Sequence, residues 1–400
     1  MKKIFKYAML FAMACSLTTA MTSCSSNDDD TPQTGQLSEG DKYLQKVLAA
    51  NVDNTINPTY KALADGCEKL NNELEALTPG SITQQQVDNV CKTFLEARAN
   101  YESSEAFLLG AASHFLIDPH IDSWPLGLNE LYNYLKADHK YKITDQSILG
   151  FHGIEFILFR DGKPRKAAEL NSHDSYNQAG IDFTIFSGTQ ELDYAKAVAE
   201  DLRNSVYRLE CSWDENANKE HVKVLDELET VYKTDKGFSY GYEMKNAGDP
   251  TKSTYNTVKL AVSSVLTGDN SAGGIADEVG NTKINNPFSG KAESYIESPY
   301  SYNSLTDFQN NIHSIENVWF GGVEGKRGEY SFHNYFKKYD AKVGQRVETA
   351  ISDALKQIAA IKYPFVKNIK DPQCKNAIKA CQELNDALAA ASDFVGKNNK

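Results

Sequence analysis

The chain has 400 residues and is acidic, with a formal net charge of −12 and a pI near 5.2. Nucleic acids and anionic membrane surfaces require clustered Lys and Arg, and the sequence has only short basic runs such as 163–166, so we expect no nucleic-acid ligand. The composition, 41% hydrophobic and 24% charged, is typical of a soluble protein. The length of the chain is enough for about two or three domains.

The first 23 residues are predicted to be a lipoprotein signal peptide, with a basic start, a short apolar stretch and small residues before Cys24. Residues 21–24, Met-Thr-Ser-Cys, resemble a bacterial lipobox, whose cysteine is lipidated; the alternative is an ordinary signal peptide. Residues 24–39 are polar and acidic, which predicts a disordered tether. The Asp triplet in this predicted tether resembles the export signal of Bacteroidetes lipoproteins. We therefore expect an outer-membrane lipoprotein, anchored through Cys24, that faces the cell exterior.

From residue 40 onward, apolar residues recur at helical spacing and alternating runs are scarce. Long helices are predicted over 87–108, 190–213, 305–319 and 347–358, and a further one from Asp371-Pro372. This pattern predicts an all-α fold of two packed up-and-down helical bundles, with an N-terminal bundle over 40–186 and a C-terminal bundle over 187–397. Three polar stretches interrupt the helices, and loops of such length usually line a site: 160–187, 236–250 and 283–302.

The apolar run 150–159 contains one histidine and one glutamate, His152 and Glu155. Residues three apart share a helix face, and imidazole with carboxylate suits iron, zinc or manganese. A helix that is apolar on all sides is buried, and a buried carboxylate must be paired, protonated or bound to a metal. The pair therefore predicts either a metal site or a buried polar network in which Glu155 pairs with an arginine or a hydroxyl.

The predicted helix 87–108 offers partners for this pair. Arg98, Tyr101 and Glu105 fall on its apolar stripe, so we expect them to face the bundle core. Inward-facing charges on two buried helices can build a metal or polar site. The alternative is a plain ion pair between Arg98 and Glu105 or Glu155.

A zinc hydrolase usually needs three protein ligands, and the second histidine of the zincin motifs is missing here. A third ligand would have to come from His120, His313 or Glu105. The second His-x-Ile-Glu, at His313 and Glu316, lies beside its helix's apolar stripe, which favours a solvated or interface role.

The sequence Gly150-Phe-His152-Gly-Ile-Glu155 matches the GxHxxE motif of the imelysin family, also called peptidase family M75. Four further segments resemble the family in order: 97–112, 121–135 with its Asp-x-Trp-Pro, 273–288 and 298–322. The resemblance implies two all-α bundles with the motif near their junction, in secreted or lipid-anchored proteins linked to iron uptake. By position, His152 and Glu155 are the motif residues and Gly150 its first glycine, with Glu105, Asp122 and Trp124 as supporting candidates.

We therefore expect a non-catalytic lipoprotein that binds iron or zinc, or a metal complex such as haem, and serves iron acquisition. The Tyr-rich loop 295–302 is a candidate source of an axial haem ligand. An outer-membrane transporter is the expected protein partner. Two alternatives stay open: a zinc-dependent metallopeptidase of the M75 type, and a module that binds peptide or glycan without catalysis.

Overall fold

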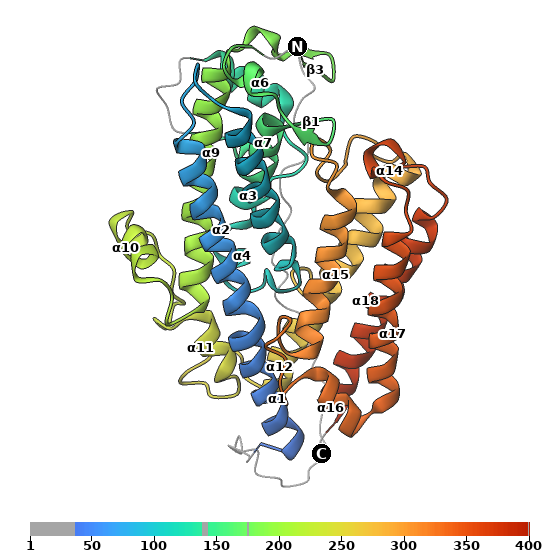
Figure 1. Cartoon of the computed structure of the whole chain (residues 1–400). Helices are drawn as coiled ribbons and strands as arrows, with labels where there is room; N and C mark the ends of the chain where they lie inside the picture. The colour runs from blue at the N-terminus through green and yellow to red at the C-terminus, as the bar shows by residue number, and fades with distance from the viewer. Residues whose placement is uncertain (1–36, 138–142, 174–175, 399) are drawn as a thin grey trace, which may run out of the picture. The chain divides into compact units, whose positions relative to one another are not determined.

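The computed structural model describes residues 37–137, 143–173, 176–398 and 400 (Figure 1). The predicted signal peptide, Cys24 and most of the predicted tether lie outside the described residues. The elements in chain order, with 3-10 and π segments marked η, are α1 (Glu39–Asn51), η1 (Val52–Ile56), α2 (Asn57–Glu75), α3 (Gln84–Glu102), η2 (Glu105–Phe107), α4 (Ala111–His114), α5 (Asp118–Ile121), α6 (Leu128–Lys136), η3 (Gln146–Ile148), α7 (Gly150–Leu158), β1 (Phe159–Arg160), β2 (Lys163–Pro164), α8 (Ala167–Leu170), β3 (Asn177–Gln178), β4 (Ile181–Asp182), η4 (Phe183–Ile185), α9 (Gly188–Trp213), α10 (Lys219–Glu227), α11 (Tyr240–Lys245), α12 (Val258–Leu266), α13 (Ala272–Asp277), η5 (Glu278–Ile284), α14 (Asn285–Ser289), α15 (Ser304–Phe320), α16 (Phe332–Tyr339), α17 (Ala341–Ala359), η6 (Phe365–Lys367) and α18 (Cys374–Lys397).

The all-α prediction is confirmed. The strands of the described residues form two short antiparallel hairpins, β1–β2 and β3–β4. Helices α3 and α9 both begin at a capping box. The side chains of Thr83 and Ser187 accept a hydrogen bond from the third helical N–H, and their backbone N–H groups donate to the side chains of Gln86 and Gln190. These caps fix where two of the main helices start.

The main helices fall into two groups that pack among themselves. In the first group, α2 packs against α3 and α9, and α7 packs against α3 and α9. In the second, α18 packs against α13 and α17, and α15 packs against α13 and α17. Contacts between α3 and α15 join the groups, which Figure 1 shows in blue to green and in orange to red. The segments that line this junction therefore come from both halves of the sequence.

Two predicted helix boundaries are wrong. The helix predicted over 87–108 ends at Glu102, because the Ser104 hydroxyl donates to the Tyr101 carbonyl that a continuing helix would use. Glu105 consequently lies on the 3-10 segment η2. The last helix begins at Cys374 and not at Pro372, since Asp371 accepts hydrogen bonds from the N–H groups of Lys362 and Gln373 and caps a turn.

Residues 37–400 form one compact unit. The predicted domain boundary falls just before α9, and α9 packs against α2 and α7. The division into 40–186 and 187–397 stays a prediction. In the described ranges, no helix combines the length and the apolar character needed to cross a bilayer.

Candidate functional site

Helix α7 carries the GxHxxE residues into the centre of the molecule. All nine of its residues are buried, and the side chains of His152 and Glu155 are 2% and 1% exposed. Gly150 opens the helix with φ +78°, and a Cβ there would overlap the carbonyl oxygen of Ile121. Glycine thus allows α5 to approach α7 closely. This contact places Asp122, the residue after α5, beside His152.

The carboxylate of Glu155 contacts both His152 and a loop that is distant in the sequence. One carboxylate oxygen, Oε1, accepts hydrogen bonds from Tyr300 N (3.0 Å), Ser301 N (2.8 Å) and Ser301 Oγ (2.7 Å). The other, Oε2, lies 3.2 Å from His152 Nδ1. Because a carboxylate can only accept here, we assign a proton to Nδ1. The second ring nitrogen, Nε2, therefore faces the rest of the site.

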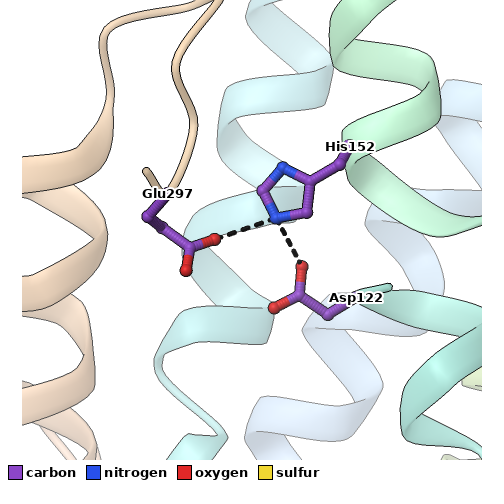
Figure 2. A group of neighbouring side chains, drawn as sticks. All are labelled: Asp122, His152 and Glu297. Atoms are coloured by element: carbon purple, nitrogen blue, oxygen red, sulfur yellow. Dashed lines mark ion pairs between the residues drawn. The ribbon is translucent and has the colours of Figure 1, made fainter. Parts of the chain in front are cut away.

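Nε2 of His152 faces two carboxylates (Figure 2). It lies 3.2 Å from Asp122 Oδ1 and 2.9 Å from Glu297 Oε1. Glu297 comes from the loop between α14 and α15, so the three side chains come from three separate segments. One ligand atom from each lies within 4.8 Å of the others. We call Asp122, His152 and Glu297 the trio; its nitrogen and carboxylate donors fit iron, zinc or manganese.

Arg98, on α3, is a fixed positive charge beside the trio. Its side chain is 1% exposed, and its guanidinium approaches the imidazole and four carboxylates: His152, Glu102, Asp122, Glu297 and Asp307. The contacts to Asp122 and Glu297 use the same oxygens that face His152. A metal ion at the trio would therefore compete with Arg98 for these oxygens.

Lys283 is a second buried cation, on the π segment η5. Its Nζ lies 3.4 Å from Glu297, 3.6 Å from Glu105, 3.8 Å from Glu102 and 4.0 Å from Glu278. Glu297 thus bridges the two cations, with Oε1 toward Arg98 and Oε2 toward Lys283. Segments of π-helix recur at functional sites, and here one aims a lysine at the acidic cluster.

Carboxylates outnumber cations in this cluster. Seven of them contact the three basic side chains Arg98, His152 and Lys283: Glu102, Glu105, Asp122, Glu155, Glu278, Glu297 and Asp307. Burial raises the pKa of Glu102 to about 8 even though Arg98 and Lys283 oppose the shift. Burial also raises the pKa of Asp307 to about 6. The excess negative charge must be relieved by bound protons or by a cation.

The trio itself stays charged. Burial and Arg98 disfavour the imidazolium, but Asp122 and Glu155 outweigh them and raise the pKa of His152 well above its usual value. Burial opposes ionisation of Glu297, but Lys283 and Arg98 lower its pKa to about 2. Arg98 and His152 likewise hold the pKa of Asp122 well below its usual range, against the effect of burial. Metal binding at Nε2 therefore has to displace a proton.

A cavity of about 190 Å³ adjoins the trio at Asp122. Its other charged lining residues are Glu105, Asp118, Asp269, Glu278 and Lys283. A wider, more open hollow of about 740 Å³ shares Asp269, Glu278 and Tyr295 with it. The shared residues indicate a route from solvent toward Asp122.

The structure brings together most of the residues singled out in the sequence. Arg98, Asp122 and His152 contact one another and Glu155 contacts His152, whereas Glu105 belongs with Glu102 and Asp122 in a neighbouring acidic group. The other two supporting candidates lie at the rim of the cluster: Tyr101 donates to Asp118, and the Trp124 ring packs on Tyr295.

The other histidines considered as ligands lie elsewhere. His120 Nδ1 lies 2.8 Å from Asp201, and His313 lies 2.8 Å from Glu316 with 47% of its side chain exposed. The sequence reading missed Glu297 and Lys283. Both lie in the stretch 283–302, which was expected to line a site, but residue spacing in a loop does not say which side chains point inward.

Comparison with known proteins gives the family. The family model Peptidase_M75, described as imelysin, matches residues 56–391. Iron-regulated protein A of Synechococcus elongatus is 23% identical over 353 residues, which cover 88% of this chain and 84% of that protein.

Two solved structures extend the likeness to the fold. A crystal structure assigned as an iron-regulated protein A precursor, from Parabacteroides distasonis, is 27% identical with a TM-score of 0.73 and covers 90% of this chain and 97% of its own. An imelysin-like protein from Psychrobacter arcticum 273-4 is 12% identical with a TM-score of 0.52, with coverages of 89% and 94%. Since the family model spans most of the sequence, the chain belongs to the imelysin family.

Proposed function

We propose that this protein binds an iron ion through Asp122, His152 and Glu297 and serves iron acquisition without catalysing a reaction. The observation that carries the proposal is the orientation of His152. A histidine that ligates a metal almost always donates its other ring N–H to a carboxylate or carbonyl. Glu155 fills that role at Nδ1, which directs Nε2 at two further carboxylates.

This arrangement gives the two motif residues different roles. His152 is the ligand, and Glu155 is the residue that positions it, held in turn by the loop 300–301. Glu297 replaces Glu155 and Glu105 in the ligand set expected from the sequence. The names of the relatives from Synechococcus elongatus and Parabacteroides distasonis describe regulation by iron, which supports iron among the metals that this donor set accepts.

A free ion fits the site better than haem. The adjoining cavity of about 190 Å³ is smaller than the roughly 300–1,000 Å³ of pockets for drug-sized ligands. Five carboxylates line it, whereas haem needs an apolar slot. In the loop expected to provide an axial tyrosine, Tyr300 is 6% exposed and packs against Phe156.

The cellular setting is part of the proposal. We place the protein at the outer membrane, anchored through a lipid on Cys24 and facing the exterior, where an outer-membrane transporter would be its partner. Labelled palmitate should enter the wild type and not Cys24→Ala, and protease added to intact cells should degrade the wild-type protein. Label in the variant, or full protection of the wild type, would contradict this placement.

The metal itself is tested by elemental analysis of purified protein after loading with Fe(II), Zn(II) or Mn(II) and desalting. We expect one iron per chain in the wild type, and loss of iron in His152→Ala and Asp122→Asn. His313→Ala is the matched control, because His313 has the same spacing to a glutamate but is exposed.

Three results would redirect the interpretation. Zinc retained in preference to iron would identify a zinc site and return attention to hydrolysis. Equal iron in the wild type and both trio variants would place the metal elsewhere. Absence of metal from a folded wild type would make the trio a buried polar network.

A further inference from the structure

The loop that carries Glu297 is held against the segment that carries His152. Helix α7 continues directly into β1, and the two-residue turn of the β1–β2 hairpin follows at Asp161 and Gly162. His152, Glu155 and this turn therefore belong to one continuous stretch of chain. Figure 2 shows the loop of Glu297 facing the helix of His152 across the site.

This stretch contacts the loop at three points. Within α7, the Glu155 carboxylate accepts the backbone N–H of Tyr300 at 3.0 Å. In the turn, the backbone N–H of Gly162 donates to the Tyr300 carbonyl oxygen at 2.9 Å. The hydroxyl of Tyr302 donates to Asp161 Oδ1 at 2.8 Å. Both backbone polar groups of Tyr300 are thus bound by the stretch that carries His152. We call Asp161, Gly162 and Tyr302 the clasp.

The loop is strained at two residues. Ser298, which follows Glu297, has φ +41°, and Tyr302 has φ +63°. Residues other than glycine adopt such a left-handed conformation only where surrounding contacts fix them, and they gather at sites that hold ligands. The contacts on Tyr302 are close, since a Cβ on Gly162 would overlap its ring and the ammonium of Lys367 lies 4.8 Å from its centroid. The shape of the loop therefore depends on the clasp.

Glu297 takes its position from this loop, because it lies between α14 and α15 and not on a helix. Its backbone carbonyl accepts a hydrogen bond from the Ser304 hydroxyl, and its Oε1 lies 2.9 Å from His152 Nε2. The same oxygen pairs with Arg98. An ion at the trio competes with Arg98 for this oxygen, so the backbone contacts of the loop have to keep the carboxylate in place.

We propose that the clasp positions Glu297 for the ion and limits how fast the ion leaves. This inference rests on the proposed iron site and adds a control on release to it. Opening of the clasp frees the far end of the loop, so Glu297 moves away from the ion while Asp122 and His152 stay in place. Asp161 is exposed, so the clasp opens at the surface without unfolding of the core. A ligand that is held ready in this way lowers the cost of binding.

The rate of iron release tests the clasp. Purified, iron-loaded protein is mixed with an excess of a coloured Fe(II) chelator. Tyr302→Phe keeps the ring and loses the hydroxyl, so we expect release about tenfold faster, with the rate of binding and Tm nearly unchanged. Asp161→Asn keeps an oxygen acceptor and should release iron at close to the wild-type rate. In iron-free protein, hydrogen exchange at residues 300–301 should be faster in Tyr302→Phe, which reports opening of the clasp without any metal.

The second hairpin provides a matched control. Its turn, Ala179 and Gly180 between β3 and β4, has positive φ at both residues, as the turn of the first hairpin does. Alanine at Gly162 would overlap the Tyr302 ring, whereas a Cβ at Gly180 would meet no atom within 4 Å. The two substitutions share the same backbone strain. Only Gly162→Ala should therefore speed iron release and hydrogen exchange at 300–301.

The outcomes separate the clasp from the iron site. Release at the wild-type rate from Tyr302→Phe, in a wild type that does hold iron, would overturn the clasp alone. Equal acceleration in Gly162→Ala and Gly180→Ala would also overturn it, and Tyr302→Phe decides if Gly162→Ala does not fold. A folded wild type that holds no iron would instead overturn the proposed function, and the role of the clasp in release would fall with it.

Discussion

At the scale of single residues, the two carboxylate oxygens of Glu155 make different contacts. Substitution by glutamine distinguishes these contacts, because it keeps one oxygen and replaces the other with an NH₂ group. Oε1 accepts three hydrogen bonds from Tyr300 and Ser301, and Oε2 faces Nδ1 of His152. In Glu155→Gln the single oxygen will stay with the three donors, which turns the amide NH₂ toward Nδ1. Nδ1 then faces a donor and cannot keep its proton, so the remaining imidazole proton stays on Nε2, the nitrogen that has to coordinate the metal.

We therefore predict that Glu155→Gln lowers iron affinity about 10–100-fold, the usual effect of losing a residue that orients a ligand. The free energy of unfolding should fall by about 1–3 kcal/mol, because the hydrogen bonds lose a charged acceptor. Iron competition against a chelator and urea unfolding measure the two effects. Glu316→Gln is the matched control, since Glu316 pairs with His313 at the same spacing. Unaltered iron affinity in a folded Glu155→Gln would show that Glu155 does not orient the ligand.

Titration of Asp307 is expected to make the stability of the protein depend on pH. It accepts hydrogen bonds from Ser298 and Asn303, and burial raises its pKa from the ordinary value of 3.8 to about 6, although Arg98 opposes the shift. Between these two pH values the unfolded chain binds fewer protons at this site than the folded protein. Stability from this carboxyl is therefore present at low pH and is lost as pH rises through about 6.

Asp307→Asn removes the titration, so the variant should become more stable relative to the wild type as pH rises. Between pH 4 and pH 7 the difference in unfolding free energy should move toward the variant by about 1–3 kcal/mol. Urea unfolding in the presence of a chelator measures this difference. Asp353→Asn, at an exposed helical position with a similar amide partner, should show no such change. Parallel stability curves for the wild type and Asp307→Asn would refute the assignment.

At the scale of elements, the start of α7 decides whether the trio can assemble. Gly150 has φ +78°, a left-handed conformation, and a Cβ would overlap the Ile121 carbonyl one residue before Asp122. We predict that Gly150→Ala destabilises the fold by about 2–5 kcal/mol, from backbone strain together with overpacking. Because Asp122 moves with Ile121, bound iron should be lost as well.

Gly80→Ala isolates the backbone effect. Gly80 has φ +86°, but a Cβ there would meet no atom within 4 Å. This variant should lose about 1–2 kcal/mol and keep its iron. Unfolding curves and elemental analysis of both variants make the comparison. Equal losses of stability, or iron retained in Gly150→Ala, would show that the close approach of α5 to α7 is not needed.

Helical spacing predicted the elements well and the site in part. The spacing placed Arg98 on an apolar stripe, and Arg98 is fully buried. His152 and Glu155 stood out because charge is rare in an apolar helix. Glu297 and Lys283 were not found, since one lies in an irregular loop and the other on a π segment whose period differs from 3.6. Spacing also failed at Ser104, where a local hydroxyl contact ended α3 early and moved Glu105 off the helix.

At the scale of the whole molecule, the trio joins segments from both halves of the sequence. Asp122 and His152 come from the first half, whereas Glu297 lies in the loop before α15. Glu155 adds a second link, because it binds the backbone of residues 300 and 301. The site is thus assembled by folding, and an unfolded chain holds none of these distances.

Iron should therefore stabilise the folded protein as a whole. A ligand that binds the folded state alone adds about 2.7 kcal/mol at a concentration of 100 Kd, which corresponds to a rise of several degrees in Tm. We predict this rise for the wild type and His313→Ala, and its absence in Asp122→Asn and His152→Ala. Hydrogen exchange should slow at the Tyr300 and Ser301 amides, because iron holds His152 and, through it, Glu155. Saturating iron with no change in Tm would mean that the ion binds equally well to the unfolded chain, which a site built from three distant segments does not allow.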